Sequence, residues 1–167
     1  MLIRRETPAD VDAIRSVTAA AFAPSPSEAL LVDELRASAA WLPALSLVAV
    51  DSSDTVIGHV LCTRAHVSAT PVLGLGPLSV HPDHHTRGVG SALVHTALGA
   101  ADALSEPLVA LLGDPAYYHR FGFVLSNLHG ILPPDPAWQP HFQVRPLSSY
   151  TPALTGPFTY AEPFDRV

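Results

Sequence analysis

Residues 85–91 hold two glycines and an arginine directly before a helical pattern, a combination that suits an anionic ligand. The first turn of a helix offers up to four backbone amides without an intrahelical partner, together with the positive end of the helix dipole. Gly88 and Gly90 let a ligand approach the backbone closely, and Arg87 adds a charge that could reach an outer phosphate. The segment therefore indicates a diphosphate site, although a plain structural turn explains two glycines at a helix start equally well.

Two well-known phosphate-binding loops are excluded at this position. The chain has no Gly-x-x-x-x-Gly-Lys-Ser/Thr, and Leu93 stands where the third glycine of Gly-x-Gly-x-x-Gly would fall. A nucleotide-binding βαβ domain is disfavoured as well, because a hairpin is predicted before the loop and no Rossmann-type acid follows it.

The bulk properties of the chain limit its class. Its 167 residues are 48% hydrophobic and 14% charged, which is enough apolar material for one domain with a proper core. No apolar run reaches the roughly 18–20 residues that cross a bilayer, the N-terminus lacks the order of a signal peptide, and Cys62 alone allows no intrachain disulfide. We expect a soluble cytoplasmic protein with no membrane partner. The net charge of −6 and the scattered arginines argue against a nucleic-acid partner.

The N-terminal third predicts a short strand at residues 2–5 followed by two helices. Thr7, Pro8 and Asp10 supply the N-cap, the first position and the capping-box acid of the first helix. Its apolar face comprises Val11, Ile14, Val17 and Ala21.

The second helix begins at Ser25, Pro26 and Glu28 in the same way and presents Leu31 and Leu35 inward. Two strand-like runs, from residues 45 and 55, then form a hairpin with its turn at residues 52–54.

The middle of the chain predicts an apolar strand at residues 72–80, interrupted at Gly76 and Pro77. Proline has no amide hydrogen, so Pro77 indicates a bulge or an unpaired edge. A helix then follows, with a buried face comprising Val89, Leu93, Ala97, Ala100 and Leu104. Residues 108–112 predict a strand covered on both faces, and residues 113–125 predict a turn, a short helix and a strand.

The last 42 residues contain eight of the 17 prolines and show no helical periodicity. We interpret residues 126–167 as a proline-rich C-terminal arm packed on the domain, with a final strand near residues 158–160. Residues 1–167 thus predict a single mixed α/β (α+β) domain, in which helices flank one mostly antiparallel sheet.

The order of these features resembles the GNAT acyltransferase superfamily. The stretches LGLGPLSVHPDHHTRGVGSALV and LVALLGDPAYYHRFGF carry the resemblance, which covers residues 45–125 and is greatest to a bacterial branch with a GDPxYYxRFGF-like element. The coenzyme A signature of that superfamily, Gln/Arg-x-x-Gly-x-Gly/Ala, corresponds to residues 85–90, with His85 in place of the usual first residue. The resemblance implies splayed central strands, which agrees with the interruption at Pro77.

The resemblance also implies acetyl-CoA as cosubstrate and no metal. It assigns the binding of the pantetheine arm to the backbone of the strand residues Leu78, Ser79 and Val80. It assigns the binding of the diphosphate to the loop residues His85, Thr86, Arg87, Gly88, Val89, Gly90 and Ser91.

The resemblance further implies a catalytic role for Tyr118, which with Gly122 and Phe123 matches the ending Tyr-x-x-x-Gly-Phe. A thiolate that departs as an amine attacks needs a proton, and a phenol of pKa ~10 can supply one. The alternative is that Tyr118 only packs against the neighbouring aromatic side chains.

No general base is evident, because neither central strand contains an acid. The candidates are Glu28, Asp33, Glu34, Asp114 and His119. Each has another explanation, as a capping box for Glu28, a solvated helix face for Asp33 and Glu34, a helix cap for Asp114 and simple exposure for His119. A water relay is a further alternative.

Histidine, cysteine and tryptophan residues are weaker candidates for catalytic or binding roles. His81, His84 and His85 lie in one loop without a second ligand cluster, so we expect no metal site. Cys62 is expected to be a buried small hydrophobe. Trp41 and Trp138 are candidates for the lining of an acceptor pocket.

The sequence therefore predicts an N-acetyltransferase that moves an acetyl group from acetyl-CoA to a primary amine by direct attack. The alternative is a non-catalytic acyl-CoA-binding sensor. A small-molecule or peptide amine is the expected acceptor, and self-association as a homodimer stays open.

Overall fold

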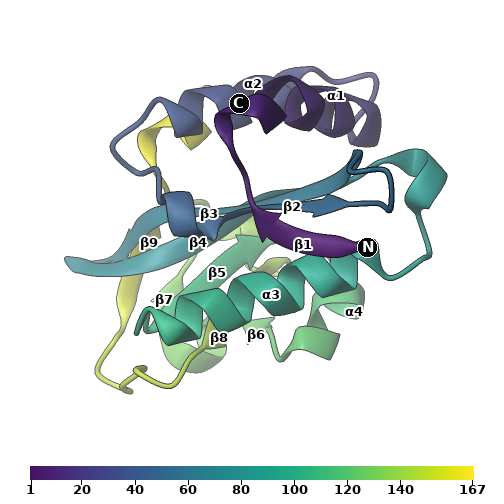
Figure 1. Ribbon diagram of the computed structural model, residues 1–167. Coiled ribbons are helices and arrows are strands. Elements are labelled where there is room, and N and C mark those ends of the chain that lie inside the picture. The colour runs from purple at the N-terminus through teal and green to yellow at the C-terminus, as the bar shows by residue number, and fades with distance from the viewer.

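The computed structural model describes residues 1–167, and nearly every element before residue 125 follows from the hydrophobic pattern (Figure 1). The helices are α1 (Val11–Ala21), α2 (Ser27–Arg36), α3 (Val89–Ala103) and α4 (Pro115–Tyr118). The strands are β1 (Leu2–Arg5), β2 (Ser46–Val50), β3 (Val56–Val67), β4 (Thr70–Val80), β5 (Leu108–Leu112), β6 (Val124–Leu125), β7 (Ile131–Leu132), β8 (Phe142–Pro146) and β9 (Gly156–Thr159).

The strands form one open sheet between two layers of helices. Its order is β1-β2-β3-β4-β5-β8-β6, with β9 paired to the end of β3 and β7 paired to β9. All pairings are antiparallel except β4 with β5 and β7 with β9. Helices α1 and α2 lie on one face and α3 on the other (Figure 1). The predicted mixed, mostly antiparallel fold is confirmed. No helix of the chain is both long and apolar enough to cross a membrane.

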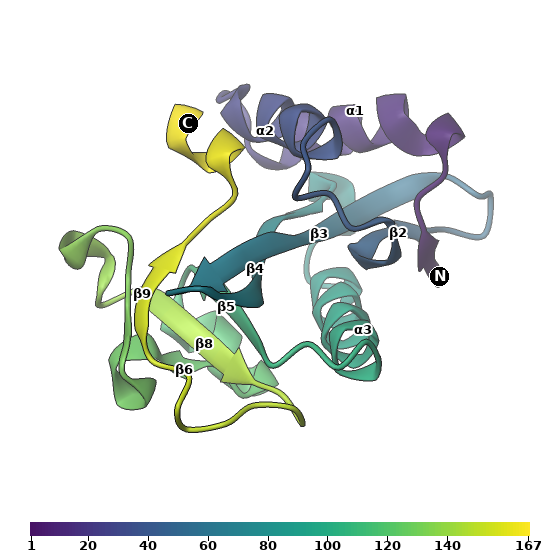
Figure 2. The same ribbon diagram turned by 90° about the vertical axis from the view of Figure 1, so that its left-hand side faces the viewer.

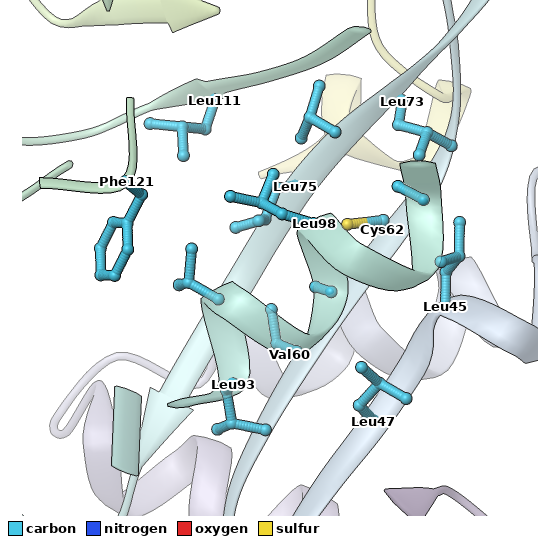
Figure 3. Close-up of a cluster of buried hydrophobic side chains, with 14 of the residues drawn as sticks. Leu45, Leu47, Val60, Cys62, Leu73, Leu75, Leu93, Leu98, Leu111 and Phe121 are labelled. Atoms are coloured by element: carbon cyan, nitrogen blue, oxygen red, sulfur yellow. The ribbon is translucent and has the colours of Figure 1, made fainter. Parts of the chain in front are cut away.

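The core divides between the two faces of the sheet, as the helical periodicities predict. On the α3 face, leucines of β2, β4 and β5 surround Cys62 of β3, whose side chain is fully buried (Figure 3). Burial raises the pKa of the Cys62 thiol to about 12, so it is an inert core residue, as expected. On the other face, Ile14 and Val17 of α1 pack with Leu31 and Leu35 of α2.

The predicted buried face of α3 is wrong at its C-terminal end. Ala101 is fully buried, whereas Ala100 lies at the margin of the cluster and Leu104, at the helix C-cap, is 51% exposed. The predicted face took a step of three residues from Ala97 to Ala100. A straight helix instead keeps the line Val89, Leu93, Ala97 and Ala101 over the sheet at steps of four.

A bulge and an early separation of two strands shape the middle of the sheet. Val60 pairs with Leu78 and Cys62 with Leu75, so β4 carries one extra residue at Gly76–Pro77. Gly76 has φ +148°, a conformation that favours glycine. On the other side, β4 pairs with β5 only at Leu73 and Gly74. Beyond these residues the two strands are not paired, which confirms the bulge predicted at Pro77 and the splay that the family resemblance implies.

The segment 126–167 is more structured than the predicted arm. Strand β8 lies between β5 and β6 within the sheet, and the prediction contained no such strand. Pro140 precedes β8 and Pro146 is its last residue, so neither proline interrupts the ladder to β5. Strand β9 matches the predicted final strand to within two residues, and the chain beyond it reaches α2 (Figure 2). There, Arg166 forms an ion pair with Glu34 of α2 at 3.2 Å.

A buried polar network ties β1, β2, β3 and α2 together around Glu6. Its carboxylate accepts hydrogen bonds from Arg36 Nε at 2.8 Å and from the Ser46 hydroxyl, and His59 Nε2 lies 3.4 Å from it. Burial alone would raise the pKa of Glu6, but the hydrogen bonds from His59, Arg36 and Ser46 outweigh it and lower the pKa from 4.5 to about 2. The folded state therefore favours the ionised carboxylate.

Replacing Glu6 with glutamine should lower the free energy of unfolding at pH 7 by about 2–3 kcal/mol, because partly buried Arg36 loses one of its two carboxylate partners. Since the folded pKa lies below the ordinary value, the contribution of Glu6 is complete above pH 4.5 and is lost as the pH falls toward 2. Urea titrations at pH 7, 4.5 and 3 should show a shallower acid decline in Glu6→Gln than in the wild type. The exposed control Glu162→Gln should match the wild type, and a parallel decline of all three proteins would contradict this assignment.

Candidate active site

Two adjoining cavities open where β4 and β5 separate. The larger, of about 630 Å³, lies at the N-terminus of α3, and the smaller, of about 400 Å³, lies between the splayed strands, α2 and the C-terminal segment. Phe22, at the end of α1, and Leu78, just after the bulge of β4, line both cavities. A molecule in the larger cavity can thus reach one in the smaller at Leu78.

The larger cavity has the features of a diphosphate site. The first intrahelical hydrogen bond of α3 runs from the Ala92 amide to the Gly88 carbonyl at 3.0 Å, so the amides of Val89, Gly90 and Ser91 have no partner within the helix. Gly88 has φ +79° with open space beside its α-carbon. A Cβ at Gly90 would lie 2.9 Å from the Tyr117 hydroxyl. The small residues therefore keep a cradle of amide donors open.

His85 closes the loop that bears these amides. Its Nε2 lies 2.9 Å from the backbone carbonyl of Val80, and since a carbonyl can only accept, the ring donates. The bond joins the start of the loop to the last residue of β4. It gives a structural role to the residue that departs from the family signature.

Eight of the ten predicted cofactor-binding residues line the larger cavity. They are Leu78, Val80, His85, Thr86, Gly88, Val89, Gly90 and Ser91. Ser79 points to the opposite face of the strand, where its hydroxyl lies 3.1 Å from that of buried Thr18. Arg87 is exposed and outside the lining. Strand alternation explains the direction of this side chain, whereas the predicted role of Ser79 concerns its backbone.

Arg120 lines the same cavity and was missed by sequence reasoning. Its guanidinium lies 4.6 Å from the ring centroid of Tyr117, and its Nε donates to the Tyr117 carbonyl at 2.8 Å. The remaining guanidinium donors are free to meet an anion. The available signal was the spacing of three residues between Tyr117 and Arg120, which places both on one side of a helical turn.

Replacing His85 with alanine should weaken acetyl-CoA binding about three- to tenfold, because one hydrogen bond that holds the loop is lost. His85→Gln, which retains a donor, should bind nearly as tightly as the wild type. Isothermal titration of each variant with acetyl-CoA makes the comparison. Equal weakening in both variants would show that the imidazole itself, rather than its bond to Val80, matters.

The smaller cavity is walled by elements far apart in the sequence. The bulge of β4 and the end of β5 form its floor, and Trp138, Tyr160 and Phe164 come from the C-terminal segment. Tyr160 lies so close to Gly74 that a Cβ there would approach its ring to 2.9 Å. Trp138 therefore lines this cavity, and it was one of the two tryptophans named as candidates for an acceptor pocket. Trp41 instead lies under Arg36, 5.3 Å from its guanidinium.

Tyr118 lines the smaller cavity next to the bulge. Its ring also packs against Tyr117, Phe121 and Phe123, with centroid distances of 4.9, 6.2 and 5.8 Å. Burial, with a smaller effect of Tyr117, raises the pKa of Tyr118 to about 12. The phenol therefore keeps its proton near neutral pH and can only donate it. Packing and proton donation are compatible at this residue.

Gly113 lets the Tyr118 ring lie against the backbone. A Cβ at Gly113 would sit 2.6 Å from Tyr118 Cε2, closer than real contacts allow. The glycine of the Gly-Asp-Pro turn is thus explained by a close approach rather than by its own backbone angles. Asp114 follows it and caps α4 by accepting from the Ala116 amide at 2.9 Å.

Gly113→Ala should displace the Tyr118 ring and lower kcat about tenfold or more, because small misplacements of a reacting group are costly. The KM for acetyl-CoA should change little, since Gly113 is not in the larger cavity. Steady-state kinetics test this against Gly99→Ala, a control in α3 where a Cβ meets nothing within 4 Å. An unchanged kcat in Gly113→Ala would contradict the constraint on Tyr118.

Four of the five candidates for a general base have partners outside the smaller cavity. Asp33 pairs with Arg15 and Arg36, Glu34 with Arg166, and Asp114 caps α4. Exposed His119 has its Nδ1 3.1 Å from the Pro115 carbonyl.

Glu28 is the exception, because it lines the smaller cavity. Its predicted capping box is absent, since Pro26 is the N-cap of α2 and no side chain caps it. No group of three or more His, Cys, Asp or Glu side chains could hold a metal ion.

The comparisons with known proteins agree with this geometry. The family model described as the acetyltransferase (GNAT) domain matches residues 2–126. The chain therefore belongs to the GNAT acetyltransferase family, and the family resemblance stated from its motifs is confirmed. Its fold and site are those of an acyl-CoA-dependent N-acetyltransferase.

Particular relatives cover nearly the whole chain. The Escherichia coli (strain K12) protein YhbS, named an uncharacterized N-acetyltransferase, is 34% identical over 169 residues, with 99% of each chain covered. Its crystal structure in complex with CoA matches 99% of this chain and 92% of that chain with a TM-score of 0.92. A GNAT acetyltransferase from Brucella melitensis in complex with acetyl-CoA matches at 34% identity and a TM-score of 0.81, covering 98% and 97%.

Proposed function

We propose that this protein transfers an acetyl group from acetyl-CoA to a primary amine by direct attack within a ternary complex. The observation that carries the proposal is the meeting of two cavities at Leu78, one with a diphosphate cradle and one lined by Tyr118. The crystal structures of two relatives at 34% identity contain CoA or acetyl-CoA. Both substrates can then be held at once, without a covalent acyl-enzyme.

The donor would lie with its diphosphate on the amides of Val89, Gly90 and Ser91. Arg120 would add a positive charge beside it. The pantetheine amides would meet the backbone of β4 after the bulge, where the edge facing β5 is unpaired beyond Gly74. An unpaired strand edge offers amide and carbonyl groups in extended register.

The acetyl thioester would then lie near Leu78, where the cavities meet. Attack by the amine nitrogen forms a tetrahedral intermediate, whose oxyanion a backbone amide of β4 would stabilise. Tyr118, a neutral phenol with a raised pKa, would donate its proton to the departing sulfur. Tyr118 is thus the proposed catalytic acid.

We also infer that residues 1–167 act as one unit. Nearly all of the segment 126–167 lies outside the family-model match, yet it supplies one wall of the smaller cavity and strand β8, which pairs with β5. Removing it would open the amine site and leave β5 paired only with β4.

Tyr118→Phe should lower kcat by about 100-fold or more, because a general acid contributes on that scale. The dissociation constant for acetyl-CoA should stay within about twofold, since the phenol acts on the leaving group. Release of the CoA thiol with a panel of primary amines measures the first quantity, and calorimetric titration measures the second. The control Tyr150→Phe removes a hydroxyl that contacts only His129, at 3.1 Å, and should keep full turnover.

Two outcomes would contradict the proposal. Tight acetyl-CoA binding with no CoA release across the amine panel would instead support a sensor of acyl-CoA. Full turnover in Tyr118→Phe would remove the proposed acid from the mechanism.

A further inference from the structure

The smaller cavity combines apolar walls with a single acidic side chain. Eleven of its 14 lining residues are hydrophobic, and Glu28 is the only acidic or basic side chain in a lining that also includes the last residue, Val167. Glu28 enters from the first turn of α2, across the cavity from the splayed strands. A volume of about 400 Å³ is at the small end of ligand pockets. The cavity is therefore suited to a small, largely apolar molecule.

The Glu28 carboxylate has no partner within the protein to satisfy it. Its Oε2 is shielded from solvent and makes no hydrogen bond. The other acids of α2, Asp33 and Glu34, are both in ion pairs with arginines. A buried carboxylate oxygen without a partner is costly. Its position in a cavity indicates that a bound molecule supplies the missing donor.

We propose that Glu28 receives the ammonium group of the acceptor and takes its proton, and that the acceptor is a primary monoamine on an apolar body. This inference rests on the proposed acetyl transfer and names its substrate class. An ammonium group supplies both the charge and the hydrogen-bond donors that Glu28 lacks. Leu31, Trp138 and Phe164 would surround the apolar body.

The proton transfers balance as follows. The acceptor ammonium gives one proton to a Glu28 carboxylate oxygen and becomes a neutral amine. Its nitrogen attacks the thioester carbonyl carbon, the C–N bond forms, and the C–S bond breaks as Tyr118 protonates the sulfur. The second nitrogen proton returns to the Tyr118 oxygen, and Glu28 releases its proton to solvent. The products are the amide, the CoA thiol and one proton.

The same walls discriminate among amines. A diamine of similar length would place its second ammonium among hydrophobic side chains, with no second acidic side chain to meet it, at a large desolvation cost. A short hydroxylated amine would bury little apolar surface. The cavity should therefore prefer 2-phenylethylamine to 1,4-diaminobutane and to 2-aminoethanol.

Kinetics with these three amines test the role of Glu28. For the wild type, kcat/KM with 2-phenylethylamine should exceed that with either polar amine at least tenfold. Glu28→Gln should lower kcat/KM for 2-phenylethylamine about 100-fold at pH 7, with acetyl-CoA affinity unchanged. Asp12→Asn, a change at an exposed acid of α1 away from the cavity, should behave as the wild type.

The pH profile separates a base from a merely structural residue. An amine of pKa ~10 is almost entirely protonated at pH 7, so Glu28→Gln should act only on the small neutral fraction. Its kcat/KM should rise about tenfold per pH unit between pH 7 and 9, while the wild-type profile rises less steeply. Parallel profiles would overturn the assignment of Glu28 as the base.

Binding of 2-phenylethylamine to the complex with CoA, which cannot turn over, distinguishes the two levels of the proposal. In one outcome, binding weakens at least tenfold in Glu28→Gln, but the wild type releases no CoA from acetyl-CoA. This result would support the amine site and contradict acetyl transfer. In the other outcome, CoA release is efficient but is equal in Glu28→Gln and the wild type, or is faster with 1,4-diaminobutane. This result would support acetyl transfer and overturn the role of Glu28.

Discussion

The separation of β4 from β5 is the constraint on which the rest of the site depends. The two strands share only two residue pairs, at Leu73 and Gly74 of β4. Their ladder ends there, just before the extra residue of β4 at Gly76–Pro77. Because the separation lies inside a sheet, it creates an unpaired strand edge and a cavity between layers that are otherwise tightly packed. The two helical layers then determine what each side of this opening can bind. Helix α3 directs free amides at one cavity, and α2 directs a carboxylate into the other.

Rigid surroundings hold the opening in shape. Tyr160 packs over Gly74 at the last shared pair of β4 and β5, and β8 supports β5 along its full length on the far side. The network around Glu6 anchors the C-terminal end of α2 through Arg36. Helix α2 therefore has a fixed end at the sheet, while its first turn, which carries Glu28, faces the cavity. The position of the carboxylate is thus determined by contacts far from the chemistry.

Much of the fold could be predicted because its signals are local. The strand-like apolar runs of β2 and β3, the period of α1 and the proline of the bulge are each signals within a few residues. The missed features depend on long-range packing. Strand β8 is a strand because β5 and β6 flank it, and its short sequence between prolines carries no pattern strong enough to show this. Glu28 resembled a capping residue, and only the tertiary structure shows that its carboxylate faces a cavity.

The division of the cavity walls along the chain has an evolutionary consequence. The cradle for the diphosphate and the bulge of β4 lie within residues 2–126, the part that the family model describes. Trp138, Tyr160 and Phe164, which face the proposed acceptor, lie after it. Substitutions in this late segment can change the shape of the amine site while the donor site keeps its contacts. The architecture is therefore modular, and new acceptors can be acquired by descendants of such a protein without any loss of acyl-donor binding along the way.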